Sequence, residues 1–174
     1  MLFEDEASFQ LDPTLHRTWA RVGQQPRVAT RGERKTAHIF GAIALDDARF
    51  DFAFASVFNG YTFLGFLKRL VQRYRRKVIL IIDNAPCHNL EPDGRAWLAA
   101  NAHRIELHRL PAYSPELNAI EGVWKLTRRR TTHNRYFDTP AQRDAALTDT
   151  FVDFQRNPAQ LDAQVRRFRG PMAA

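Results

Sequence analysis

The sequence has little cysteine and no long apolar run, and each absence excludes a class of protein. Its 174 residues include a single cysteine, Cys87, so an intramolecular disulfide is impossible and a zinc site built on cysteines is implausible. No stretch approaches the roughly 18 consecutive apolar residues of a membrane-spanning helix. The first residues, MLFEDEASF, carry acids where a signal peptide carries bases. We therefore expect a soluble protein of the reducing cytoplasm, with no membrane partner.

Acidic residues are scarce relative to basic ones. The chain has 26 Lys and Arg against 19 Asp and Glu, a net charge of +7, and the segments 68–77 and 125–135 contain bases but no acid. Such an excess favours a polyanionic partner such as nucleic acid, although either segment could equally be a solvated helix face. With 44% hydrophobic residues the chain can bury a core, which excludes a disordered chain, and its length fits one domain.

The hydrophobic pattern changes its period along the chain and predicts an α/β fold. Alternating apolar residues or short aliphatic runs predict strands, whereas apolar residues three and four apart predict helices. A helix precedes the aliphatic run 78–82, so this strand should lie parallel to an earlier one in a mixed sheet. Strands are expected at 1–9, 37–45, 50–58, 78–82 and 104–108, and helices at 63–74, 92–100, 114–130 and in the tail.

Two local signals refine this order. The turn-forming segment Gly23-Gln24-Gln25-Pro26 separates 17–21 from 27–30 and predicts a small hairpin. After a loop at 110–113, Ser114-Pro115-Glu116 supplies an N-cap, a proline in the first turn and an acid, which predicts a helix running to about Arg130. Its buried stripe would consist of Leu117, Ile120 and Trp124.

Asp5 lies within the first expected strand, where a carboxylate is disfavoured. One explanation is that the strand ends near Phe3 and leaves Asp5 in solvent. If the strand continues, alternation sends Glu4 and Glu6 to the face opposite Asp5. With both faces covered, at least one of these two glutamates should lie near an edge or pair with a base.

Two further acids, Asp83 and Glu121, also lie next to segments that are predicted to be buried. Asp83 follows the strand 78–82 at its carboxyl end, where α/β sheets gather ligands, although a turn-forming Asp-Asn pair looks the same. Glu121 borders the apolar stripe of its helix, or pairs with Lys125 one turn later.

Asp5, Asp83 and Glu121 would repel one another at one point, and a divalent cation removes that penalty. Magnesium prefers oxygen ligands, and two ions ~3.5–4 Å apart can activate an attacking oxygen and stabilise a departing one at phosphorus.

Four segments carry a family resemblance in a fixed order. They are Asp5 in FEDEASF, Trp19-Ala20-Arg21 before Gly23, DNAPCH at 83–88, and LPAYSPELNAIEGVW at 110–124. Together they resemble the DDE catalytic domain of mariner-superfamily transposases, in the bacterial insertion-sequence branch. The spacing of 37 residues between Asp83 and Glu121 adds to the likeness, which spans Met1 to about Phe137.

The resemblance implies a ribonuclease-H-like fold, with a mixed five-stranded sheet flanked by helices. It implies Asp5, Asp83 and Glu121 as catalytic metal ligands for magnesium or manganese, with two ions when DNA is bound. The implied chemistry is hydrolysis of DNA at transposon ends, then attack of the freed 3′-hydroxyl on target DNA. The implied partners are DNA and a second copy of the chain, as an active homodimer associated with the bacterial nucleoid.

The domain organisation departs from the family pattern. We expect one domain over 1–174, with a core of about 1–137 and a helical tail at 138–174. Helix-turn-helix domains that read terminal repeats are expected upstream in the family, and only four residues precede Asp5. The chain would then be a catalytic fragment, the product of a split reading frame or a decayed remnant. Ala119 replaces the proline usual before Ile-Glu, which a helix tolerates.

Other functions and residues remain open at this point. A nuclease limited to hydrolysis would share the fold and the metal site, and a silent DNA-binding remnant would keep only the basic surface. His88, and less so Asn84, could contact substrate or steady the metal ligands from behind, or simply occupy a surface turn. Cys87 is not expected to be a nucleophile, Trp124 is expected in the core, and Trp19 could touch DNA or the sheet. Candidate DNA contacts are Lys125, Arg128, Arg129 and Arg130.

Overall fold

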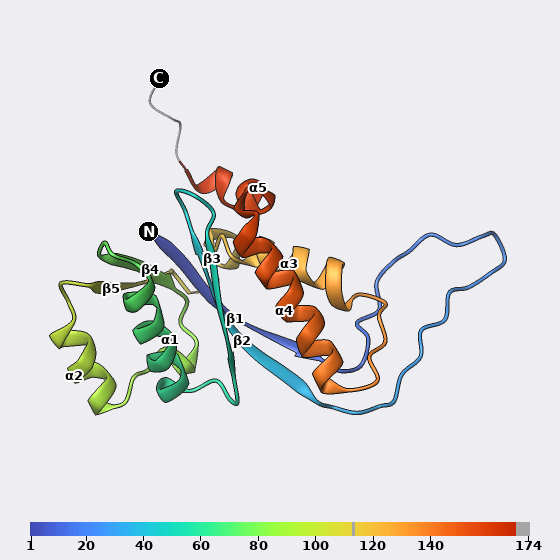
Figure 1. Ribbon diagram of the computed structural model, residues 1–174, viewed down its shortest axis with the longest axis horizontal. Helices are drawn as coiled ribbons and strands as arrows, with labels where there is room; N and C mark the ends of the chain where they lie inside the picture. The colour runs from blue at the N-terminus through green and yellow to red at the C-terminus, as the bar shows by residue number, and fades with distance from the viewer. Residues whose placement is uncertain (113, 170–174) are drawn as a thin grey trace, which may run out of the picture.

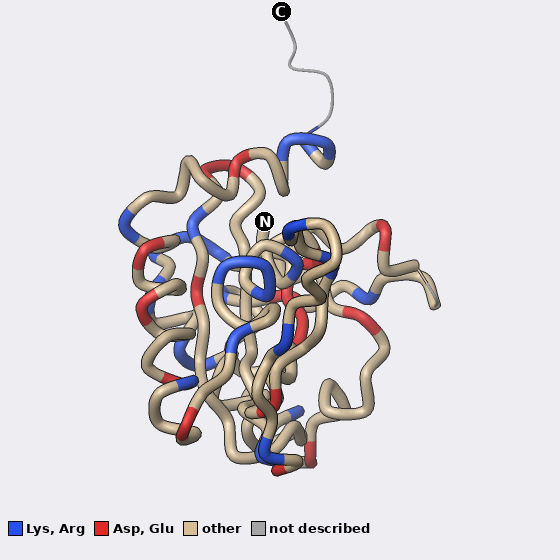
Figure 2. The backbone as a smooth tube through the Cα atoms, turned by 90° about the vertical axis from the view of Figure 1, so that its right-hand side faces the viewer, with Lys and Arg blue, Asp and Glu red and all other residues tan. Residues whose placement is uncertain are grey.

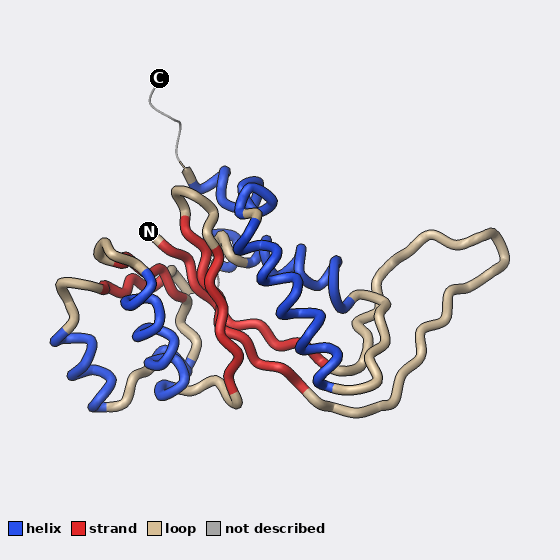
Figure 3. Tube along the Cα trace, in the orientation of Figure 1, coloured by secondary structure: helices blue, strands red, loops and turns tan. Residues whose placement is uncertain are grey.

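A five-stranded mixed sheet lies between two layers of helices in the computed structural model, which describes residues 1–112 and 114–169 (Figures 1 and 3). The strands are β1 (Leu2–Gln10), β2 (Thr36–Ala44), β3 (Phe50–Ala55), β4 (Val78–Ile82) and β5 (Ile105–Arg109). Their order across the sheet is β3-β2-β1-β4-β5. The first three strands are antiparallel to one another, and β4 runs parallel to both β1 and β5. The predicted mixed sheet is therefore confirmed.

Helices cover both faces of this sheet. Helices α1 (Gly60–Arg73) and α2 (Pro92–Ala100) lie on one side, and α3 (Glu121–Thr127), α4 (Pro140–Arg156) and α5 (Asp162–Val165) on the other (Figure 1). Short 3-10 turns occur at Pro86–His88, Pro115–Leu117, Pro158–Leu161 and Arg166–Phe168, and a π-helical turn at Arg128–Thr132. Among the described residues, every helix is too short or too polar to span a membrane.

Strand alternation divides the interior into two cores. Odd-numbered residues of β1, such as Phe3 and Phe9, pack with Trp124 beneath α3 and α4. Even-numbered Leu2 faces the other core, with Phe63 of α1. Helix α4 belongs to the first core through residues that are fully buried: Leu147, Phe151 and Phe154.

The ladder between β1 and β4 is short, and this opens the sheet where β4 ends. Only Leu2–Leu80 and Phe3–Ile81 are paired, and beyond them the two strands diverge. Neighbouring strands whose connections leave in opposite directions create a crevice at their carboxyl ends, where α/β sheets bind ligands. Asp5 and Asp83 both follow this last pair.

Two local predictions were wrong. The hairpin at 17–21 and 27–30 does not form: the turn exists, with Gln24 N donating to Arg21 O at 3.0 Å, but no strands flank it. The segment instead extends away from the body as a long loop (Figure 1), and Trp19 on it is fully exposed, touching no part of the sheet. Likewise, β3 ends at Ala55 rather than Phe58.

The expected helix 114–130 is broken into three pieces. A 3-10 turn at Pro115–Leu117 ends at Asn118, whose backbone is extended (φ −96°, ψ 111°), and α3 begins only at Glu121. The side chain of Ser114 caps no helix, and Leu117 is 43% exposed, so the predicted N-cap and part of the buried stripe were wrong. Trp124 is buried as predicted. The expected loop 110–113 includes Tyr113, which lies outside the described residues.

Candidate active site

Three carboxylates from separate elements line one pocket. Asp5 comes from the middle of β1, Asp83 from the residue after β4, and Glu121 from the first residue of α3. The pocket has a volume of about 440 Å³, and its remaining walls come from 84–85, 110–112, Ser114, Pro115 and Asn118. The structure thus brings the three predicted acids to one place, at the crevice between β1 and β4.

The negative charge of Asp5 is unfavourable in this pocket. Burial, followed by the charges of Glu6, Glu121 and Asp83, raises the pKa of Asp5 from 3.8 to about 7. One of its oxygens, Oδ2, accepts a hydrogen bond of 3.2 Å from the indole Nε1 of Trp124. Such uncompensated negative charge, presented by oxygen ligands alone, fits a divalent cation of the magnesium type.

The carboxylates are spread rather than clustered. Among the described residues, the oxygens of Asp5, Asp83 and Glu121 do not all lie within 4.8 Å of one another. Like charges on the three carboxylates repel one another and favour such spacing. Two ions ~3.5–4 Å apart would also need carboxylates that are spread along the pocket, rather than gathered at one point.

The indole beneath Asp5 requires a glycine on the neighbouring strand. Gly41 of β2 is the partner of Asp5 in the ladder. A Cβ added at Gly41 would lie 2.4 Å from an indole carbon of Trp124 and 3.0 Å from the Ile120 side chain. The absence of a side chain at Gly41 therefore lets Trp124 pack flat against the strand and reach Asp5.

Asparagine side chains tie the walls of the pocket together. Asn84 Nδ2 donates to the carbonyl of Leu110 at 2.9 Å, which links the segments after β4 and β5. Asn118 is buried, and its Nδ2 donates at 3.1 Å to the carbonyl of Glu4, where the β1–β4 ladder has stopped. Both side chains bond to the backbone of the pocket walls, and no bond from either side chain to the three carboxylates is present in the described part of the chain.

His88 lies behind the pocket, between the acids of β1 and Asp83. Its Nε2 is 3.0 Å from both Glu4 Oε2 and Glu6 Oε1, and its Nδ1 is 3.1 Å from Asp83 Oδ1. Burial alone would lower the pKa of His88, but the hydrogen bonds and charges of Glu4 and Glu6 outweigh it and raise that pKa. Complete burial raises the pKa of Glu4 in turn.

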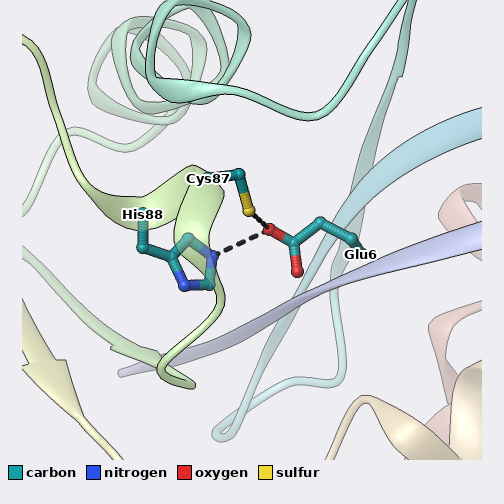
Figure 4. Close-up of side chains that lie close together, drawn as sticks. All are labelled: Glu6, Cys87 and His88. Carbon is teal, nitrogen blue, oxygen red and sulfur yellow. Dashed lines mark hydrogen bonds and ion pairs between the residues drawn. The ribbon is translucent and has the colours of Figure 1, made fainter.

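The thiol of Cys87 belongs to the same cluster. It donates to the Glu6 carboxylate, so Cys87 and His88 both point at one oxygen of Glu6 (Figure 4). Burial, and then the bond to Glu6, raises the pKa of Cys87 well above its usual range. A thiol that stays protonated is a poor nucleophile, in agreement with the expectation from the sequence.

A basic groove adjoins the acid pocket. Three of the four candidate DNA contacts, Lys125, Arg128 and Arg129, line it together with His16 and His133, whose rings stack at 4.5 Å. The fourth, Arg130, is held elsewhere, 3.5 Å from Asp153. Elsewhere the backbone carries both signs of charge (Figure 2), and the other segment of bases without an acid, 68–77, spans the end of α1 and the turn before β4.

Sequence patterns did not identify every residue that shapes the site. Strand alternation placed Glu4 and Glu6 opposite Asp5 and required a base for at least one of them, but it did not name His88. The ladder partner of Asp5, Gly41, carries no sequence signal of its own. The bond from Trp124 to Asp5 was also missed, because helical spacing shows only that the indole is buried.

Comparisons with known proteins identify the family of the chain. A family model described as DDE superfamily endonuclease matches residues 1–142. An insertion element IS630 uncharacterized 39 kDa protein of Shigella sonnei is 29% identical over 136 residues, which cover 77% of this chain and 39% of that protein.

Solved structures of low identity share the fold. The Mos1 mariner paired end complex with Mn has a TM-score of 0.62 at 19% identity, covering 95% of this chain and 53% of that one. The catalytic core domain of BIV integrase has a TM-score of 0.52 at 15% identity, covering 78% of this chain and 91% of that one. These likenesses show the ribonuclease-H-like fold predicted from the sequence. The chain spans about half of the Mos1 chain and less of the IS630 protein.

Proposed function

The chain belongs to the DDE superfamily endonuclease family, and on that premise we propose that it is the catalytic domain of an insertion-element transposase. It cuts DNA phosphodiesters at the ends of the element and joins the freed 3′-hydroxyl to target DNA. The observation that carries this proposal is the convergence of Asp5, Asp83 and Glu121 on one pocket beside a basic groove. The Shigella sonnei relative supports a bacterial protein acting at the nucleoid.

The three acids hold two divalent ions, magnesium or manganese, when DNA is bound. The Mos1 complexes with Mn and with Mg support this choice. Bound in the pocket, the metal supplies activation of the attacking oxygen and stabilisation of the leaving oxygen. Asp83 and Glu121 would hold it with their carboxylates, and so would Asp5, whose Oδ2 accepts the bond from Trp124.

The groove holds the DNA backbone beside the acids. Lys125, Arg128 and Arg129 face it with no acid among the lining residues, which suits phosphate contacts without base readout. The Mos1 paired-end complex with the left transposon end supports element ends as substrate. A homodimer that pairs two ends completes the proposal, with residues 1–174 forming one catalytic domain and end recognition residing in other domains.

A strand-transfer assay tests the proposal directly. The substrates are a labelled duplex with a free 3′-hydroxyl, representing a pre-cleaved end, and a supercoiled plasmid. With Mn²⁺ the expected product is a relaxed plasmid carrying the label, absent with EDTA. Asp149→Asn, an exposed acid on α4, serves as a matched control for Asp83→Asn.

The products separate the competing functions. Relaxed plasmid without label shows a nuclease limited to hydrolysis. Binding without either product shows a DNA-binding remnant. Unchanged strand transfer in Asp83→Asn would refute the assignment of the acids.

A further inference from the structure

The face of β1 opposite Asp5 carries a buried cluster that the proposed chemistry does not use. Glu4 and Glu6 flank Asp5 in sequence, and their side chains are 0% and 10% exposed. Burying two carboxylates is costly unless a base pairs with them. His88 is that base, and its own side chain is fully buried.

The ring of His88 has close neighbours on more than one side. Its Nε2 faces Glu4 and Glu6 at equal distances of 3.0 Å, and the ring of Phe63 packs beside it at 4.6 Å between centroids. Cys87 donates to the same Glu6 oxygen that faces the imidazole (Figure 4). The remaining nitrogen, Nδ1, is therefore aimed at Asp83 by contacts on the far side of the ring.

At Asp83 the imidazole faces both the main chain and the carboxylate, since Nδ1 bonds to the Asp83 carbonyl oxygen at 3.2 Å and lies beside one carboxylate oxygen, Oδ1. Oδ1 accepts a bond of 2.7 Å from the Ala85 backbone N–H and lies 3.1 Å from His88 Nδ1. With Oδ1 bonded to the Ala85 N–H and close to the imidazole, the rotation of the side chain is restricted. The Asp83 side chain is 45% exposed, and the solvent on that side would not hold it in this orientation without these contacts.

The backbone ladder fixes the spacing of β1 and β4 over a short length only. The β1–β4 pairing stops at Phe3–Ile81, before either acid. His88 crosses this gap with its side chain, joining the neighbours of Asp5 to Asp83 itself. Functional groups must be held within roughly 0.5 Å of their working positions, which backbone alone does not achieve here.

We propose that His88 is a positioning residue for the metal site: anchored by Glu4 and Glu6, it orients the Asp83 carboxylate and sets its distance from Asp5. This inference rests on the proposed function, because it assigns a purpose to the orientation of a metal ligand. His88 touches neither DNA nor metal in this role.

Two substitutions each keep the hydrogen-bonding group of one ring nitrogen of His88 and remove the other. In His88→Asn the side-chain amide replaces Nδ1 and keeps a donor toward Asp83. In His88→Gln the amide replaces Nε2 and keeps a donor toward Glu4 and Glu6. His103→Gln, at an exposed histidine after α2, is the matched control.

The primary readout is the affinity for Mn²⁺ without DNA, measured by electron paramagnetic resonance of the free ion. We expect His88→Gln to bind Mn²⁺ at least tenfold more weakly, as loss of a residue that orients a metal ligand does. His88→Asn keeps the donor toward Asp83 but loses the anchor, so its Mn²⁺ affinity should lie between those of His88→Gln and the wild type, and His103→Gln should not change. In cleavage assays, excess metal should restore most of the rate of His88→Gln.

Several results would overturn the inference. Equal Mn²⁺ affinity in both His88 variants and the wild type removes the positioning role, and equal losses in both reduce His88 to a structural residue. One equivalent of bound zinc, lost in Cys87→Ser, would make the cluster a metal site instead. If circular dichroism shows that the His88 variants do not fold, Glu6→Gln, which keeps the shape, decides: unchanged Mn²⁺ affinity refutes the role.

The failure of this inference is distinguishable from failure of the proposed function. A wild-type protein that neither binds Mn²⁺ nor cleaves DNA refutes both. A wild-type protein that does both, with variants that match it, refutes only the role of His88.

Discussion

Replacing Asp5 with asparagine should remove activity and yet stabilise the metal-free protein. The pKa of Asp5 rises from 3.8 in the unfolded chain to about 7 in the fold, because the side chain is buried and three other acids lie near it. A difference of about 3 units, at about 1.4 kcal/mol per unit, makes the ionised form about 4 kcal/mol less favourable in the fold. An amide keeps the shape and can still accept the indole bond of Trp124.

The sign of the effect depends on pH. Between pH 4 and pH 7 the folded protein retains a proton on Asp5 that the unfolded chain has released, so the free energy of unfolding falls as pH rises. Above pH 7 both states are ionised and the full penalty is present. Asp5→Asn should therefore exceed the wild type by up to about 4 kcal/mol at pH 8 and match it near pH 4.

Urea unfolding in EDTA, followed by far-ultraviolet circular dichroism at both pH values, measures this difference. Asp149→Asn removes an exposed charge and should change stability little at either pH. Adding Mg²⁺ should stabilise the wild type but not Asp5→Asn, since only the native site binds the ion. A variant less stable than the wild type at pH 8, or a difference independent of pH, would refute the argument that Asp5 is held against its neighbours.

Three other substitutions test separate parts of the site. Asp83→Asn should abolish cleavage with an unchanged circular dichroism spectrum, because this side chain is 45% exposed; cleavage above about one hundredth of the wild-type rate would contradict a metal-ligand role. Arg129→Gln should lower the slope of log DNA affinity against log salt concentration by about one unit in fluorescence anisotropy. Arg130→Gln should not change this slope, because Arg130 is already paired with Asp153. Equal slopes for both variants would show that the groove does not bind DNA. Gly41→Ala should lower stability by about 1–3 kcal/mol in urea unfolding, because its methyl group overlaps the packed indole, whereas Gly65→Ala, with open space around it, should not; equal stability would contradict the close approach.

The strands that position Asp5 and Asp83 were predictable because their signals are local. The aliphatic run before Asp83 identifies a buried strand and its carboxyl end, and β1 alternates as its sequence indicates. Alternation also required a base for the side chains opposite Asp5, and the structure supplies His88. Which base fills that place depends on the packing of a segment 80 residues away, and no periodicity contains that information.

The wrong predictions share a cause: in each, a local sequence signal was taken to determine the structure of more residues than it does. The turn at Gly23 forms with φ +78°, but the flanking residues have no sheet edge to pair with and Trp19 remains in solvent. The spacing of Leu117, Ile120 and Trp124 suits a continuous helix, but Asn118 leaves the helix to bond the Glu4 carbonyl. A carbonyl freed by the end of a distant ladder outweighs local helix preference at that position.

Three consecutive acids in β1 create opposite demands on the two faces of the sheet. Glu4 and Glu6 are directed to a face where His88 supplies positive charge, whereas Asp5 is directed to a face where the nearest charged side chains in the pocket are two more acids. Burial raises the pKa of Glu4 to about 8, so Glu4 keeps its proton at neutral pH and His88 balances Glu6, whereas the other face is left negative. A basic side chain in the acid pocket would stabilise the fold but occupy the place of a cation. Introducing one tests this directly: Ser114→Lys, at the pocket wall, should raise metal-free stability and weaken Mn²⁺ binding together, and stability gained without loss of Mn²⁺ affinity would show that the negative charge does not serve metal binding.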